Sequence, residues 1–185
     1  MKASKCSETR ARTCRELGWN ESGRRQGCLL PAFNRANVGQ ETRPVTLAVA
    51  EDAILRFATV IGETDPLHLD RVAARKAGHA GLVAPPTFAA VLIEMAGEEL
   101  RASGHLDLGG LVAGPGSTLL HGEETYRYLA PIVAGQQVEV TTRVLEVDSV
   151  GDGRIERARF EITVTTPEGG PLVTILRTVL QVSPR

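Results

Sequence analysis

Residues 85–102 read PPTFAAVLIEMAGEELRA, and this stretch decides the fold. A proline at the first helical position is preorganised for a helix, so we expect a helix from Thr87 to about Ala102. Its apolar residues wrap around more than one face, and polar residues become frequent only from Glu98 onward. These apolar residues are Phe88, Ala89, Val91, Leu92, Met95 and Ala96. A helix of this kind is buried, so the rest of the domain must wrap around it.

Downstream of the helix, a Gly-rich loop from Gly109 to Gly116 is followed by alternating apolar and polar residues. This period of two predicts four long strands joined by turns rich in Gly and Pro. The expected strands are Leu119–Tyr128, Gln137–Val147, Arg154–Thr165 and Leu172–Val182. The third has one dry face, formed by Ala158, Phe160, Ile162 and Val164. An antiparallel sheet wrapped around one long central helix makes the fold class α+β.

Upstream of the central helix, the sequence predicts a short strand and two shorter helices. An apolar stretch from Val45 to Val49 precedes acidic residues 51–52, which favour a helix N-terminus. About three helical turns follow, and Gly62 is a natural stop. Their apolar face is formed by Ile54, Phe57, Ala58 and Ile61. Asp70 is the expected N-cap of a short helix from Arg71 to Lys76.

The loop between these two helices concentrates the residues of an acid/base site. Residues 62–68 read GETDPLH, which places Glu63, Asp65 and His68 beside a Gly and a Pro. A general base and a general acid must both reach one substrate, and titratable groups of unlike pKa on a rigid loop meet that need. The alternative is a polar loop in which Asp65 makes an Asx turn and His68 has a structural role.

The composition is that of one soluble domain: 185 residues, 42% hydrophobic and 23% charged. The first 38 residues carry eight Lys/Arg and three Glu, whereas the rest carries thirteen basic and nineteen acidic residues. We therefore expect a basic, disordered extension over residues 1–38 and a single folded domain over residues 39–185. The acidic body argues against nucleic acid as a partner.

The three cysteines lie in the basic extension, and their spacings match no zinc or redox pattern. We expect free thiols in a reducing compartment, hence a cytoplasmic protein. No apolar stretch there is long enough for a secretory signal, although the Arg content leaves a transit peptide open. The longest apolar window, residues 82–93, falls short of the ~20 residues that a membrane span needs. We expect no metal site, because the histidines and carboxylates lack a typical ligand spacing.

The acid/base loop resembles that of MaoC-type (R)-specific enoyl-thioester hydratases, whose pattern is aromatic, apolar, Gly-Asp-x-Asn-Pro-apolar-His. Phe57 and residues 62–68 match it in order and spacing, with Glu63 at the Asp position and Asp65 at the Asn position. Other segments resemble more narrowly the N-terminal MaoC-like dehydratase branch of that family. They are residues 73–78, 81–88, 120–123 and 131–135. The resemblance covers roughly residues 37 to 183.

This resemblance implies the hot dog fold and the reversible addition of water across the C2=C3 bond of a trans-2-enoyl thioester. The reverse reaction dehydrates a 3-hydroxyacyl thioester. His68 and one carboxylate then share the proton transfers through a bound water. Glu63 matches the family's catalytic Asp by position but has one more methylene, so Asp65 is the alternative partner. CoA or phosphopantetheine is part of the substrate, and we expect no other cofactor.

The resemblance also implies substrate-binding residues. In related hydratases a backbone N–H at the start of the central helix points at the thioester oxygen. Prolines 85 and 86 have no N–H, so we expect the unpaired N–H groups of Thr87 and Phe88 to replace it. His121, on the first long strand, is expected near the acyl tunnel and the helix start. It either hydrogen-bonds the loop or the substrate or is a structural histidine at a strand end.

Carrier and partners are less sharply defined by the sequence. Arg71, Arg75 and Lys76 form a small basic patch that suits the phosphates of CoA or an acidic acyl carrier protein, or is simply a solvated helix face. The resemblance also implies a dimer, either of two copies or with another MaoC-type chain, because a second hot dog unit completes the exposed edge strand and the open tunnel. Two other functions stay open: a non-catalytic acyl-binding subunit of a heteromeric dehydratase, and an acyl-thioester hydrolase on the same fold.

Overall fold

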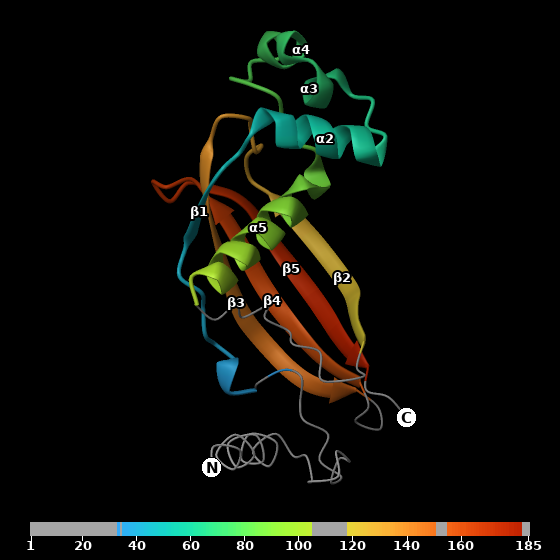
Figure 1. Cartoon of the computed structure of the whole chain (residues 1–185), viewed down its shortest axis with the longest axis vertical. Coiled ribbons are helices and arrows are strands. Elements are labelled where there is room, and N and C mark those ends of the chain that lie inside the picture. The colour runs from blue at the N-terminus through green and yellow to red at the C-terminus, as the bar shows by residue number, and fades with distance from the viewer. Residues whose placement is uncertain (1–32, 34, 105–117, 151–154, 183–185) are drawn as a thin grey trace, which may run out of the picture.

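The computed structural model describes residue 33 and residues 35–104, 118–150 and 155–182, and within these ranges the chain has the hot dog fold. Five antiparallel strands form one sheet in the order β1-β3-β4-β5-β2 (Figure 1). The strands are β1 (Val45–Ala48), β2 (Thr118–Tyr128), β3 (Gln137–Val150), β4 (Ile155–Thr165) and β5 (Pro171–Val182). The two edges of the sheet are therefore β1 and β2.

The central helix α5 (Ala89–Ala102) lies across one face of the sheet and is preceded by the short 3-10 helix η2 (Pro86–Phe88) (Figure 1). Three further helices lie beyond the end of the sheet that is nearest to η2. They are α2 (Glu51–Ile61), α3 (Pro66–Leu69) and α4 (Arg71–Lys76). A second 3-10 helix, η1 (Arg35–Asn37), precedes β1. The expected α+β class is confirmed.

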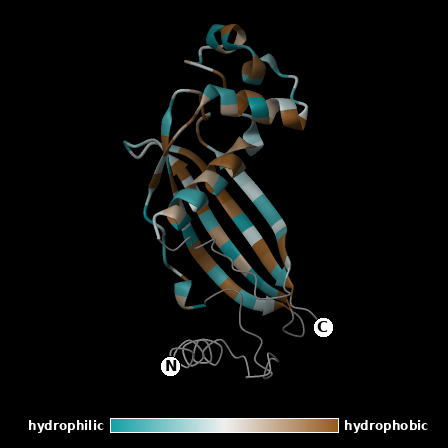
Figure 2. Cartoon of the chain, in the orientation of Figure 1, coloured by the Kyte–Doolittle hydropathy of each residue, from teal (hydrophilic) through white to brown (hydrophobic). Residues whose placement is uncertain are grey.

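The core lies between α5 and the inner face of the sheet. In Figure 2 the strands show alternating apolar and polar residues, as a sheet with one dry face requires. The dry face predicted for the third strand is confirmed, because Ala158, Phe160, Ile162 and Val164 are all buried. From α5 and η2 the buried residues are Phe88, Ala89, Leu92, Ile93, Ala96 and Leu100.

One prediction about the central helix is wrong, because its apolar face is narrower than expected. Met95 is 38% exposed, whereas Ile93 and Leu100 point into the core. The buried positions follow a single stripe at helical spacing, since α5 packs on one sheet and nothing among the described residues covers its other side.

The strand boundaries agree closely with the alternation in the sequence. β3 continues to Val150, three residues beyond its predicted end. Two β-bulges shift the register, between His121 and Glu123 in β2 and between Val144 and Glu146 in β3. Residues 109–116 and 151–153, which were predicted as loop and turn, lie outside the described ranges.

The packed part of the chain begins before residue 39. Phe33 is buried in the core, and Arg35 donates a hydrogen bond from Nη2 to the Ser149 hydroxyl at 2.8 Å. The predicted disorder of the first 32 residues stays a prediction, because these residues and their three cysteines lie outside the described ranges. In the part of the chain that the structure describes, no helix is long and apolar enough to cross a membrane.

Candidate active site

The acid/base loop begins where α2 ends. Gly62 closes the helix in the left-handed conformation (φ 72°), and the Glu63 N–H donates to the Ala58 carbonyl at 2.9 Å. Asp65 then caps the one-turn helix α3, whose first residue is Pro66. Because Pro66 starts a helix at once, the three predicted site residues stay on one short, tightly turned segment.

The His68 side chain is hydrogen-bonded to the backbone of a segment that is distant in the sequence. The residue is 9% exposed, and its Nδ1 lies 2.7 Å from the Val83 carbonyl oxygen. The Val83 N–H in turn donates to the Leu67 carbonyl at 3.0 Å. A carbonyl oxygen only accepts hydrogen bonds, so Nδ1 must carry the hydrogen. In the neutral imidazole, Nε2 therefore presents its lone pair and is able to accept a proton.

Glu63 folds back onto its own loop. Its Oε1 accepts hydrogen bonds from the N–H groups of Thr64 at 2.8 Å and Asp65 at 3.1 Å. The Asp65 and Thr64 N–H groups, followed by the charge of His68, lower the pKa of Glu63 below its usual 4.5. The side chain is therefore an anion at neutral pH. An anion beside His68 stabilises a positive charge on the imidazole, but it has no proton to donate.

Asp65 has a structural task in the loop. Its Oδ1 accepts the Leu67 N–H at 2.9 Å, which is the Asx-turn alternative that the sequence left open. The residue itself is exposed. Of the two carboxylates, Glu63 therefore remains the better candidate to act with His68.

Of the two backbone N–H groups expected to be unpaired at the helix start, those of Thr87 and Phe88, only the Thr87 N–H is unpaired among the described residues. The Phe88 N–H donates to the Pro85 carbonyl at 2.9 Å, so the prediction that it is unpaired is wrong. The 3-10 turn of η2 brings that carbonyl within reach, which a regular α-helical start would not. The Thr87 N–H has no acceptor among the described residues and lies at an exposed position.

Tyr128, which sequence reasoning missed, stabilises this helix start. Its hydroxyl donates to the Pro86 carbonyl, and burial raises the pKa of Tyr128 to about 12. The hydroxyl therefore remains a donor throughout the neutral range. The alternation of β2 carried a signal, because Tyr128 falls on the inward positions of that strand, where a tyrosine hydroxyl needs a partner.

A cavity of about 210 Å³ lies between α5 and the inner face of the sheet. Its lining includes Ile93, Gly97 and Leu100 on α5, and Phe160 and Val179 on the sheet. Apolar walls at this place suit a hydrocarbon chain.

The structure separates His121 from the helix start, contrary to expectation. His121 lines the cavity but is seven residues from Tyr128 along β2, or about 23 Å at the usual rise of a strand. Its side chain is 68% exposed, and its Nδ1 lies 3.9 Å from Glu124 Oε1. It therefore lies at the edge of the cavity, away from the end of β2 that contacts η2.

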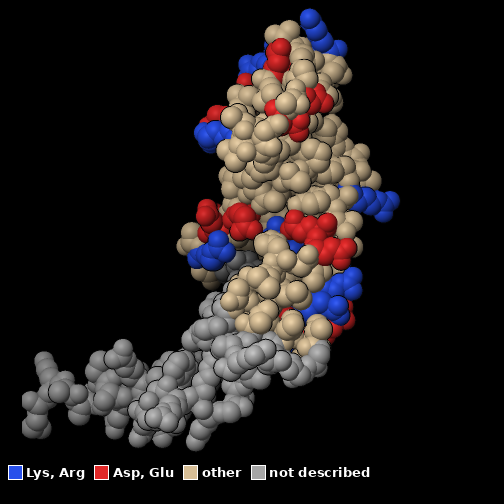
Figure 3. Space-filling model, turned by 90° about the vertical axis from the view of Figure 1, so that its right-hand side faces the viewer, with Lys and Arg blue, Asp and Glu red and all other residues tan. Residues whose placement is uncertain are grey.

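The predicted basic patch is weakened by an internal ion pair. Arg71 donates from Nε to Glu51 at 3.0 Å and from Nη2 to the same oxygen, so its charge is matched. Arg75 and Lys76 are exposed at the end of α4. The face of the molecule in Figure 3 shows acidic and basic side chains close together, without an extended basic surface among the described residues. Within those residues, no three His, Cys, Asp or Glu side chains are grouped to hold a metal ion.

Residues 36–175 match the family described as "FAS1-like, dehydratase domain region". A UPF0336 protein of Clavibacter michiganensis is 34% identical over 155 residues, which cover 84% of this chain and 91% of that protein. A UPF0336 protein of Streptomyces griseus is 32% identical over 139 residues, with 74% and 88% covered.

Solved structures share the same architecture. The HadBC complex of Mycobacterium tuberculosis, a 3R-hydroxyacyl-ACP dehydratase, matches with a TM-score of 0.64 at 19% identity, covering 78% of this chain and 96% of that chain. The R-hydratase PhaJ1 of Pseudomonas aeruginosa matches with a TM-score of 0.57 at 24% identity, covering 80% and 83%. At these identities the likeness establishes the hot dog fold.

Proposed function

We propose that this chain, which belongs to the FAS1-like dehydratase region family of MaoC-like proteins, catalyses the reversible hydration of 2-enoyl thioesters to 3-hydroxyacyl thioesters. The observation that carries the proposal is the contact between His68 Nδ1 and the Val83 carbonyl. It leaves Nε2 of a nearly buried imidazole free to accept a proton, next to a carboxylate that stays ionised. A base held in one tautomer is what proton transfer at carbon requires.

In the hydration direction, His68 Nε2 accepts a proton from a bound water as the water oxygen bonds to C3. The electrons of the C2=C3 bond move toward the thioester carbonyl and give an enolate. The imidazolium then returns the proton to C2, so that water is added and the catalyst is regenerated. Dehydration follows the same steps in reverse.

Glu63 supports this cycle as an anion. It stabilises the imidazolium that forms on His68 and orients the water, without itself changing protonation state. Its backbone donors, the Thr64 and Asp65 N–H groups, hold it in the ionised form. Asp65 acts on the loop as a cap and contributes to the chemistry through the position of the loop alone.

The Thr87 N–H is the proposed donor to the thioester oxygen, where negative charge develops in the enolate. It lies at the start of the central helix, so the helix dipole favours an anion there. One such donor is worth on the order of 10²–10³ in rate. The substrate carries CoA or the phosphopantetheine of an acyl carrier protein, and the exposed Arg75 and Lys76 suit either carrier. No other cofactor enters the reaction.

We further propose that the protein works in the cytoplasm as a dimer. Among the strands that the structure describes, β2 is an edge strand whose outer side has no partner strand. A second hot dog chain, either another copy or a different MaoC-like chain, would cover this edge.

The second candidate function is a non-catalytic acyl-binding subunit. It is favoured by the cavity beneath α5, together with the engagement of both loop carboxylates in local hydrogen bonds. In that case the partner chain supplies the chemistry and this chain holds the acyl group.

The test is to mix the purified chain with trans-2-enoyl-CoAs of increasing length and follow the loss of the conjugated enoyl absorbance. We expect hydration by the chain alone and its loss in His68→Ala. His79→Ala is the matched control, because it removes a histidine from outside the loop. Full activity in His68→Ala contradicts the mechanism. Hydration only after a partner chain is added supports the acyl-binding function, and release of free CoA thiol indicates a hydrolase.

A further inference from the structure

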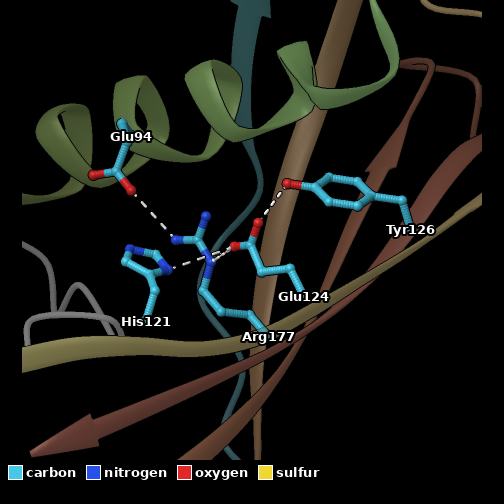
Figure 4. Close-up of polar contacts among 5 residues, drawn as sticks. All are labelled: Glu94, His121, Glu124, Tyr126 and Arg177. Carbon is cyan, nitrogen blue, oxygen red and sulfur yellow. Dashed lines mark hydrogen bonds and ion pairs between the residues drawn. The ribbon is translucent and has the colours of Figure 1, made fainter.

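A charged cluster joins the two walls of the cavity, the sheet and α5. Arg177 is on the inner face of β5, between the buried residues Ile175 and Val179, and its side chain is only 10% exposed. Its Nε donates to Glu124 Oε1 on β2, and its Nη1 lies 3.3 Å from Glu94 Oε1 on α5. Figure 4 shows the guanidinium between the two carboxylates. Arg177 is thus a cation on a face of β5 where the adjacent positions, Ile175 and Val179, are apolar.

The hydrogen-bonding capacity of Arg177 is only partly used. A guanidinium has five N–H donors, and Nη2 has no acceptor among the described residues. In Figure 4 this nitrogen points toward α5, the helix that forms the opposite wall. Arg177 and Glu94 both line the cavity. A ligand there meets a free donor from the wall.

Stability alone does not account for the cluster. Replacing a buried ion pair by apolar residues of similar volume is often neutral or stabilising, because desolvation of the charges offsets their attraction. Tyr126 also donates to Glu124 Oε2, so three polar side chains are gathered at one point of an apolar core. Such an arrangement is consistent with a role in binding.

The charge of the cluster restricts the ligand. Two carboxylates already contact the Arg177 guanidinium, so an anionic ligand would compete with them there, although Arg101 and His121 also line the cavity. A neutral oxygen accepts from Nη2 without that competition. Further along the same face of β5, Gln181 is 2% exposed, and its Oε1 has no hydrogen-bond partner among the described residues. Gln181 is not among the residues that line the cavity, so Arg177 is the donor on β5 that a chain in the cavity meets.

We propose that the cavity selects acyl chains that carry a neutral oxygen, a hydroxyl or keto group, which accepts a hydrogen bond from Arg177 Nη2. This inference rests on the proposed function, because it takes the ligand to be an acyl thioester. Glu94 follows Thr87 by seven residues, about 10 Å along the helix at 1.5 Å per residue. The oxygen recognised is therefore well along the chain, beyond the carbons that react.

The test measures binding of unreactive saturated ligands by calorimetry, so that it does not depend on catalysis. The probes are dodecanoyl-CoA and three derivatives, with a hydroxyl in mid-chain, a keto group in mid-chain or a hydroxyl on the terminal carbon. We expect at least one oxygenated chain to bind about tenfold more tightly than dodecanoyl-CoA, which is the size of one hydrogen bond to a charged donor. Comparison of the hydroxyl and keto probes shows which of the two oxygen-bearing groups the cavity prefers.

The decisive variant is the double substitution Arg177→Met with Glu124→Gln. It removes both charges of the buried ion pair at once, so neither residue is left as an unpaired charge. We expect it to lose the preference for oxygenated chains while it still binds dodecanoyl-CoA. Arg159→Met is the matched control, since it removes an exposed arginine that pairs with Glu146 instead. Equal binding of all four probes by the unmodified chain overturns the inference, as does a preference that survives the double substitution. Absence of binding to every probe contradicts the proposed function as well.

Discussion

The hydroxyl of Tyr128 donates a hydrogen bond to the Pro86 carbonyl and thereby ties the end of β2 to the start of the central helix. The next residue after Pro86 is Thr87, whose N–H is the proposed donor to the thioester. A side chain on the sheet is therefore hydrogen-bonded to the backbone of the helix start. Since Pro86 itself has no N–H, the carbonyl is the atom by which this residue can be anchored.

Tyr128→Phe should lower kcat about tenfold with a smaller change in KM, because the substrate still binds while the Thr87 N–H is less well aligned in the transition state. Removal of the hydrogen bond should also cost about 1 kcal/mol in the free energy of unfolding. Steady-state hydration kinetics and urea unfolding measure the two effects. Thr125→Val, at an exposed position of the same strand, is the control. An unchanged kcat would show that the helix start does not depend on this contact.

Stability should decline at alkaline pH because of the same tyrosine. Its folded-state pKa of about 12 exceeds the unfolded value of 10.0, so its contribution is complete below pH 10 and is lost as the pH rises toward 12. Burial also raises the pKa of Tyr126, which adds to the decline. Urea unfolding across this pH range should show a shallower decline in Tyr128→Phe. Identical slopes in the two proteins would mean that Tyr128 titrates normally in the fold.

Substitution of the two loop acids should distinguish their tasks. Glu63→Gln should lower kcat about a hundredfold, since it removes the anion beside His68. Asp65→Asn should stay within a few fold of the unmodified chain, because asparagine caps a helix as well as aspartate does. Hydration rates at saturating substrate measure both. The reverse order of effects would assign the chemistry to Asp65.

The backbone donor can be tested by removing its hydrogen alone. Thr87→Pro should lower the hydration rate on the order of 10²–10³-fold, whereas proline is tolerated in the first turn of a helix. Thr87→Val keeps the N–H and should be close to the unmodified chain. Circular dichroism and thermal unfolding verify that both variants fold. If the two variants have equal rates, the thioester oxygen has another donor.

The strands were predictable because alternation of apolar and polar residues survives wherever a sheet has one dry face. β4 shows this most clearly, with every second residue from Ala158 to Val164 buried. The helix caps were predictable for a similar local reason, since Asp70 and Gly62 act on their own neighbours in the chain. The one-turn helix α3 was missed, although Asp65 followed by Pro66 is the signature of a helix start.

The contacts that join distant segments were not predictable from local patterns. Nothing in the spacing of residues places Val83 beside His68 or Pro86 beside Tyr128, because these pairs depend on how the sheet and helices are stacked. The exposure of Met95 likewise depends on α5 packing against a single sheet. The burial of Arg177 and Gln181 could have been predicted, because they fall on the same alternate positions of β5 as its buried apolar residues.

The partner that orients His68 is a main-chain atom, and this has a consequence for how the site tolerates sequence change. No point substitution at position 83 deletes a carbonyl oxygen, and no physiological pH protonates it. The imidazole thus keeps its tautomer even where neighbouring acids differ from those of related loops, as Glu63 and Asp65 do here. Other residues of the loop can therefore be substituted while His68, at its end, keeps the same proton-accepting nitrogen.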